Sequence, residues 1–86
     1  MRIFAERLID TRNERGYTQT QLAEILDIPQ STYMHYELLG RTKAGAEPPL
    51  EMLVKIADAL DVSIDYLLGR EDYLGNEIKP KDRIGL

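Results

Sequence analysis

The sequence has no cysteine and no tryptophan, and its 86 residues include a single histidine and a single phenylalanine. Without cysteine it can form neither disulfides nor thiolate-ligated metal sites. No apolar run approaches the roughly 18 residues of a membrane-spanning helix, and the first residues do not resemble a signal peptide. These absences predict one small domain with no membrane segment, metal or cofactor, located in the cytoplasm.

Basic residues are also scarce, since 11 Lys and Arg face 15 Asp and Glu for a net charge of −4. Proteins that bind nucleic acids usually carry a basic surplus, because contacts with phosphates supply much of their affinity. Here the acidic residues crowd into one segment, opposed only by Lys55: Glu47, Glu51, Asp58, Asp61 and Asp65. The net charge therefore argues against nucleic-acid binding by that segment more than by the rest of the chain.

Residues 17–37, YTQTQLAEILDIPQSTYMHYE, predict two short helices joined by a tight turn. Thr18 and Gln21 have the spacing of a capping box at the start of the first helix. Apolar residues then recur at helical spacing, at Leu22, Ala23 and Leu26. Asp27 suits a left-handed turn conformation, and Pro29 fixes φ at the start of the second helix. The pattern is that of a helix-turn-helix.

The flanking segments predict three more helices. The first covers about residues 3–14 and ends before Gly16, as a helix followed by a C′ glycine should. A loop over residues 38–49 precedes a fourth helix, whose apolar stripe is Leu50, Leu53, Ile56, Ala57 and Leu60. Ser63 is placed to cap a short fifth helix that ends at Gly69. The fold class predicted is all-α.

Residues 4–69 resemble the phage repressor and Cro-like helix-turn-helix proteins, often called the XRE family. The lead-in RNERGYTQTQLAE and the closing LVKIADALDVSIDYLLG support the central motif on both sides. The resemblance implies a bacterial or phage protein with a compact five-helix, lambda-repressor-like DNA-binding domain over residues 1–69. It leaves residues 70–86 as a C-terminal tail that either dimerises or is disordered. The loop over residues 38–49 is longer than is usual in the family.

By this resemblance, the residues that read bases are Gln30, Ser31, Met34 and His35. A glutamine can bond N6 and N7 of adenine together, a serine can meet several base edges, and a methionine can contact a thymine methyl. His35 could donate to guanine or to a phosphate. For each of the four, an ordinary exposed helix position is the alternative.

The resemblance also implies contacts with the DNA backbone from Thr18, Gln19, Thr32, Arg41 and Lys43. The alternatives are solvated side chains, and for Thr32 a local bond to the backbone. Arg12 and Glu37 match a structural ion pair of the family. This role is preferred to a phosphate contact for Arg12, because Glu37 would otherwise face the core unpaired. Tyr33 and Tyr36 are expected in the core rather than stacked on bases.

The function expected is a transcriptional regulator, a repressor by preference, that binds a palindromic operator as a homodimer. The candidate dimer contacts are Tyr66, Leu67, Tyr73, Leu74, Ile78 and Ile84. The alternative is a protein-interaction module on the same fold, such as an antitoxin or anti-repressor with a protein partner. An enzyme is not expected, because the chain has no P-loop, no H-E-x-x-H and no nucleophile elbow.

Overall fold

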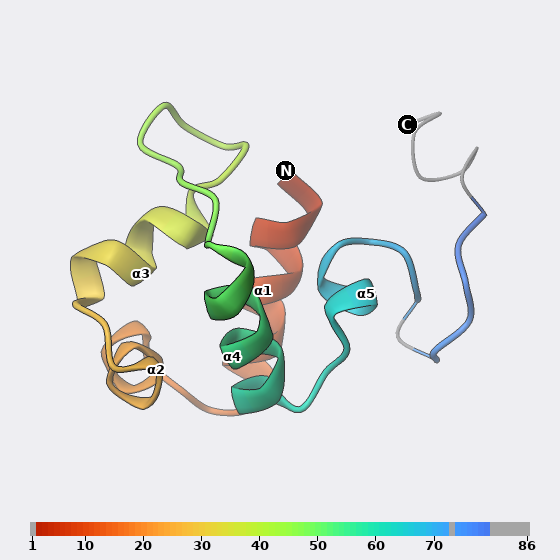
Figure 1. Ribbon diagram of the computed structural model, residues 1–86, viewed down its shortest axis with the longest axis horizontal. Helices are drawn as coiled ribbons and strands as arrows, with labels where there is room; N and C mark the ends of the chain where they lie inside the picture. The colour runs from red at the N-terminus through yellow and green to blue at the C-terminus, as the bar shows by residue number, and fades with distance from the viewer. Residues whose placement is uncertain (1, 73, 80–86) are drawn as a thin grey trace.

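The computed structural model describes residues 2–72 and 74–79, and these form five helices (Figure 1). The helices are α1 (Arg2–Glu14), α2 (Gln19–Leu26), α3 (Gln30–Glu37), α4 (Leu50–Leu60) and α5 (Ile64–Leu67). Over the described ranges β-pairing is limited to an isolated antiparallel bridge between Glu71 and Glu77. The prediction of an all-α fold is therefore confirmed. In the same part of the chain, no helix is long and apolar enough to cross a membrane.

The core lies where α1, α2, α3, α4 and α5 each bury one face. Its residues are Phe4, Leu8, Leu22, Ala23, Leu26, Tyr33, Tyr36, Leu53, Ile56, Ala57, Leu60 and Leu67. The two tyrosines of α3 are buried, as predicted, and their rings meet edge to face with centroids 6.4 Å apart. One predicted core residue is wrong: Leu50 is 74% exposed, because it is the first residue of α4 and the buried stripe begins one turn later at Leu53.

The turn between α2 and α3 has the geometry that the sequence predicts. The hydroxyl of Thr18 accepts from the Gln21 N–H at 3.1 Å, and the Thr18 N–H donates to Gln21 Oε1 at 2.8 Å. Asp27 ends α2 in the left-handed region with φ of 57°. Pro29 lies at the N-cap rather than inside α3, and its side chain has no oxygen with which to cap the helix. The capping box and the turn together fix how α3 leaves the core.

The long loop after α3 folds back onto that helix. Its closing bond runs from the Ala46 N–H to the His35 carbonyl at 3.0 Å, and the N–H groups of Arg41 and Thr42 both bond the Leu38 carbonyl. A Cβ atom on Gly45 would lie 2.4 Å from the Leu38 carbonyl oxygen and 2.6 Å from Leu39 Cα. Only a residue without a side chain can close the loop at this point.

We therefore predict that Gly45→Ala lowers the free energy of unfolding by about 1–3 kcal/mol, because the added methyl group must displace backbone atoms. The loss should be accompanied by faster hydrogen exchange of the Ala46 N–H, whose bond closes the loop. Ala44→Gly, at an exposed position of the same loop, is the matched control. Unchanged exchange at Ala46 in the Gly45→Ala variant would contradict the prediction.

The first part of the tail packs against the domain. Arg7 holds it, since Nη1 donates to the carbonyl oxygens of Tyr66 and Glu71 and the guanidinium lies 4.3 Å from the centre of the Tyr66 ring. The tail then doubles back, with the Ile78 N–H bonded to the Arg70 carbonyl at 2.8 Å. The cation of Arg7 is thereby engaged with α5 and the tail, elements that lie on the other side of the molecule from α3 in Figure 1.

Candidate nucleic-acid interface

The outer face of α3 carries the four residues predicted to read bases. Gln30, Ser31 and Met34 are exposed, and His35 is half-buried. The Nδ1 atom of His35 is buried without a hydrogen-bond partner in the described residues, so a contact with DNA would have to use the other ring nitrogen. Thr32 is half-buried at the edge of the same face. The face presents an amide, a hydroxyl, an imidazole and a thioether side by side.

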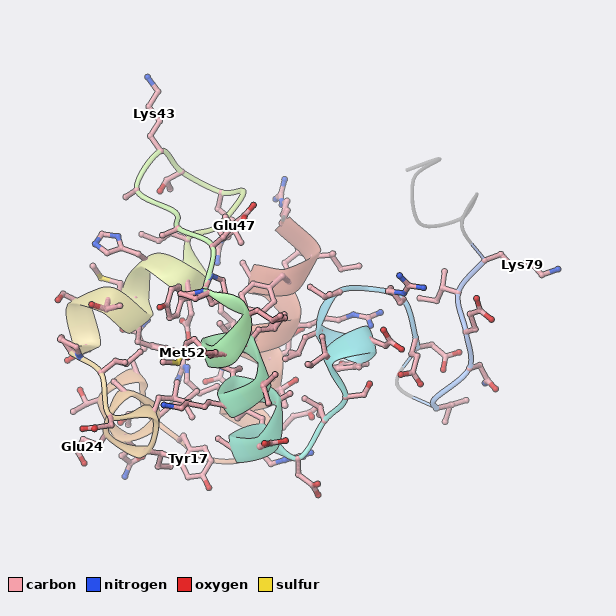
Figure 2. All side chains as sticks on the ribbon, in the orientation of Figure 1. Tyr17, Glu24, Lys43, Glu47, Met52 and Lys79 are labelled. Atoms are coloured by element: carbon pink, nitrogen blue, oxygen red, sulfur yellow. The ribbon has the colours of Figure 1, made fainter. Side chains whose placement is uncertain are left out.

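This face has no exposed carboxylate. Between Asp27 and Glu47 the chain has one acidic residue, Glu37, and only 4% of its surface is exposed. Arg41 and Lys43 follow in the loop and are both exposed. Figure 2 shows Lys43 at the tip of that loop, pointing away from the helices. Although the chain as a whole is acidic, α3 presents no exposed carboxylate, and the loop after it carries two exposed cations before the exposed Glu47.

The acidic residues lie on other elements. Glu51 and Asp58 are exposed on α4, Asp61 follows that helix, and Asp65 is exposed on α5. In Figure 1, α5 and the described tail lie on the opposite side of the molecule from α2 and α3. A cavity of about 550 Å³ opens between α1, the turn before α5 and the tail, and its lining includes the carboxylates Asp10, Glu14, Asp61, Glu71 and Asp72. These carboxylates thus lie on elements other than α3, although Glu24 on α2 and Asp27 in the turn before α3 are also exposed.

A buried ion pair ties α3 to α1. Arg12 Nε lies 2.7 Å from Glu37 Oε2 and Nη2 lies 3.3 Å from Oε1, with side chains only 12% and 6% exposed. Tyr33 donates its hydroxyl to Oε2, and Gln19 Nε2 donates to Oε1 at 2.9 Å. Burial opposes ionisation of Glu37, but the hydrogen bonds from Arg12, Tyr33 and Gln19 prevail and lower the pKa of this carboxyl below its usual value. Glu37 is therefore a carboxylate at neutral pH.

Two more arginines, one in α1 and one just after it, are also engaged within the domain. Arg15 Nε donates to the Leu60 carbonyl at 2.9 Å, and Arg7 holds the tail. Arg12 additionally donates to the Tyr17 carbonyl at 2.9 Å. The side chains of these three arginines thus make internal hydrogen bonds that join α1 and the residue after it to other parts of the domain.

Gln19 and Gln30 meet across the helix-turn-helix. Gln30 Nε2 lies 3.5 Å from Gln19 Oε1, and the hydroxyl of Thr20 donates to Gln30 Oε1 at 2.8 Å. Sequence reasoning missed Thr20, because only the folded turn brings it within reach of a residue ten positions later. Gln19 was predicted to contact a DNA phosphate. In the free protein its amide nitrogen bonds Glu37 and its amide oxygen faces Gln30.

The residues predicted at a dimer interface differ in how far the structure buries them. The prediction for Leu67 is wrong, because its side chain is fully buried in the core of the monomer. Tyr66 is half-buried beneath Arg7, and Leu74 is 71% exposed in the tail. Ile78 is half-buried. Tyr73 and Ile84, also predicted at this interface, lie outside the described residues.

A protein-family model described as helix-turn-helix matches residues 8–67 of the chain. The prophage-derived uncharacterized HTH-type transcriptional regulator YonR of Bacillus subtilis is 39% identical over 66 residues, which is 77% of this chain and 56% of the relative. The cryptic phage CTXphi transcriptional repressor RstR of Vibrio cholerae is 43% identical over 65 residues, 76% of this chain and 54% of the relative. The HTH-type transcriptional regulator ImmR of Bacillus subtilis is 36% identical over 67 residues, 78% and 49% of the two chains.

The chain spans about half the length of these curated relatives. No solved structure matches it.

Proposed function

This chain belongs to the XRE family of helix-turn-helix proteins, and we propose that it is a transcriptional regulator that binds double-stranded DNA and acts as a repressor. In this proposal α3 enters the major groove of a palindromic operator that a homodimer binds. The observation that carries the proposal is the outer face of α3, which presents no exposed carboxylate in a chain with a net charge of −4 and is followed by the exposed cations Arg41 and Lys43.

The proposed base contacts follow from the chemistry of that face. Gln30 stands on the first turn of α3, and its amide can accept from N6 of adenine while it donates to N7. Ser31 and Met34 are exposed on the same helix and would meet a neighbouring base edge and a thymine methyl. His35 would extend the contact toward the end of α3.

The proposed backbone contacts surround this face. Thr18 and Gln19 lie at the N-terminus of α2, where free N–H groups favour a phosphate. Arg41 and Lys43 would bind phosphates beyond the other end of α3, and Thr32 would contribute a hydroxyl between them. No salt bridge to an acidic side chain engages either cation in the described residues.

One such domain covers few base pairs, so selectivity requires two copies about 34 Å apart on successive major grooves. The described residues that remain candidates for contact between copies are Tyr66, Leu74 and Ile78. Leu74 has the largest exposed apolar surface of the three. The remaining candidates, Tyr73 and Ile84, rest on the sequence alone.

The test is selection of bound sequences from a random duplex pool, at low and at near-physiological salt. We expect an enriched palindrome whose binding weakens as salt rises, since phosphate contacts release counterions. The half-sites should lie about 10 base pairs apart or at a multiple of that spacing. No enrichment at either salt concentration would reject the proposal.

A protein-interaction module on the same fold is the second candidate. The exposed carboxylates of α4 and α5 favour it, since they form an acidic surface that would repel DNA and attract a basic protein. Charge reversal by Glu51→Lys and Asp58→Lys separates the two candidates. It should strengthen DNA binding nonspecifically if DNA is the partner, and abolish association with a basic protein if that protein is the partner.

A further inference from the structure

We infer that the exposed face of α4 around Leu50 and Val54 is the surface by which two copies of this chain pair, with their α4 helices antiparallel. The inference rests on the homodimer of the proposed function and deepens it, because it names a contact outside α5 and the tail. It follows from the apolar side chains that α4 exposes and from the order of the charges beside them.

The exposed apolar side chains of α4 form a pair. Leu50 is 74% exposed and Val54 is 41% exposed, and their spacing of four residues places them one turn apart on one side of the helix. The other large apolar side chains exposed in the described residues lie singly on α2, α3 and the tail, as Ile25, Met34 and Leu74. In Figure 1, α4 lies in front of α1, and no other helix passes in front of it. The monomer therefore leaves this apolar pair without a cover, and contiguous exposed apolar side chains mark contact surfaces more often than single ones do.

The charges beside this pair are unmatched within the monomer. Glu51 and Lys55 are both exposed on α4, and neither takes part in a salt bridge among the described residues. Lys55 is also the one cation in the otherwise acidic segment between Glu47 and Asp65. The surface therefore suits a partner that offers one acidic group, one basic group and an apolar pair of its own.

A second copy of α4 supplies all of these groups when it runs antiparallel to the first. A two-fold axis that passes between the helices brings the same surface of both copies together. Leu50 then packs against Val54 of the second copy, Glu51 lies beside Lys55 of the second copy, and each contact occurs twice. Parallel helices would instead place Glu51 beside Glu51, and like charges repel. The order of the charges along α4 therefore favours the antiparallel arrangement.

The size of this contact sets its strength. Stable, specific interfaces bury about 1,200–2,000 Å² in total, and the four side chains of α4 supply only part of that area. We therefore expect a weak dimer in solution, formed at micromolar or higher concentrations. An operator with two half-sites should strengthen it, because it binds both copies at once.

Analytical ultracentrifugation of the wild type and of Leu50→Ser, over a range of protein concentrations, tests the inference without DNA. We expect the wild type to dimerise and Leu50→Ser to raise the dissociation constant about tenfold or more, because each dimer loses two leucines from the contact. Leu74→Ser is the matched control, since Leu74 is 71% exposed in the tail and its loss should leave the dissociation constant unchanged. Both leucines are exposed, so neither change removes a core residue.

An exchange of charges tests the antiparallel arrangement. Lys55→Glu alone should raise the dissociation constant about three- to tenfold, since the dimer loses two exposed ion pairs. When Glu51→Lys is added, opposite charges face each other again in both pairs, and the dissociation constant should return to within about twofold of the wild type. A double variant that dimerises as weakly as Lys55→Glu would overturn the proposed arrangement.

Two further results would overturn the inference. A wild type that stays monomeric at every concentration would show that a second copy does not cover this face of α4, and would leave the face to a different protein. If Leu74→Ser dissociates the dimer and Leu50→Ser does not, the contact lies in the tail, and the homodimer of the proposed function stands. Failure of the proposed function is seen separately, as the absence of an enriched sequence in the selection from random duplexes.

Discussion

Arg12→Met is expected to lower the free energy of unfolding by about 3–5 kcal/mol, because it leaves the buried carboxylate of Glu37 without a cation. The two side chains are 12% and 6% exposed, so water cannot replace the lost partner. The same substitution removes the bond from Arg12 Nη1 to the Tyr17 carbonyl, which holds the entry to the helix-turn-helix. Urea denaturation of the two proteins measures the difference directly.

Arg2→Met is the matched control. Arg2 also pairs with a glutamate at 3.1 Å, but that pair with Glu6 is 75% and 54% exposed. An exposed pair contributes about 0–1 kcal/mol, so this variant should unfold almost as the wild type does. Equal decreases in the free energy of unfolding in the two variants would mean that burial does not make the Arg12–Glu37 pair more stabilising than an exposed pair.

Acid pH should reduce the difference in the free energy of unfolding between Arg12→Met and the wild type. The folded protein holds the pKa of Glu37 below its usual value of 4.5, so the wild type gains stability from this group above that pH and loses it as the pH falls through the lowered pKa. Without Arg12, burial opposes ionisation and raises the pKa of the same carboxyl, so lowering the pH relieves the penalty. A difference that stays constant from pH 7 to pH 3 would contradict this account.

Sequence reasoning succeeded where the signal is local. The capping box of Thr18 and Gln21, the left-handed Asp27 and the Ser63 cap of α5 each depend on residues within a few positions of one another. The pairing of Arg12 with Glu37 was implied by the resemblance to the family, supported by the argument that a charge on the buried face of a helix needs a partner, and the structure contains it.

Sequence reasoning failed where the burial or the contacts of a residue depend on which other elements pack against it. Leu50 and Leu67 both stand at apolar positions, yet the start of α4 is exposed and the short α5 drives its leucine into the core. Nothing in the spacing of Gln19, Thr20 and Gln30 tells that their side chains meet, because the meeting depends on the angle between α2 and α3. The closure of the long loop depends likewise on a backbone approach at Gly45. Such features depend on tertiary geometry, which a single sequence specifies only through the whole fold.

The combined change Gln30→Ala and Ser31→Ala is expected to abolish discrimination between the operator and unrelated DNA. Each base contact of this kind supplies about 1–3 kcal/mol of discrimination, and a dimer would lose both contacts in each of two half-sites. Nonspecific binding should survive, because the phosphate contacts come from other residues. Competition between operator and random duplexes, at one fixed salt concentration, measures the two affinities together.

Arg41→Ala with Lys43→Ala is the converse change. Removing the two loop cations should weaken binding to every duplex and reduce the salt dependence by about two phosphate contacts per protomer, while the ratio of operator to random affinity is kept. The two double variants thus separate the reading of bases by α3 from the anchoring to phosphates by the loop that follows it. If the α3 change lowered both affinities equally, Gln30 and Ser31 would be anchoring residues, and sequence selection would have to come from Met34, His35 or the shape of the DNA.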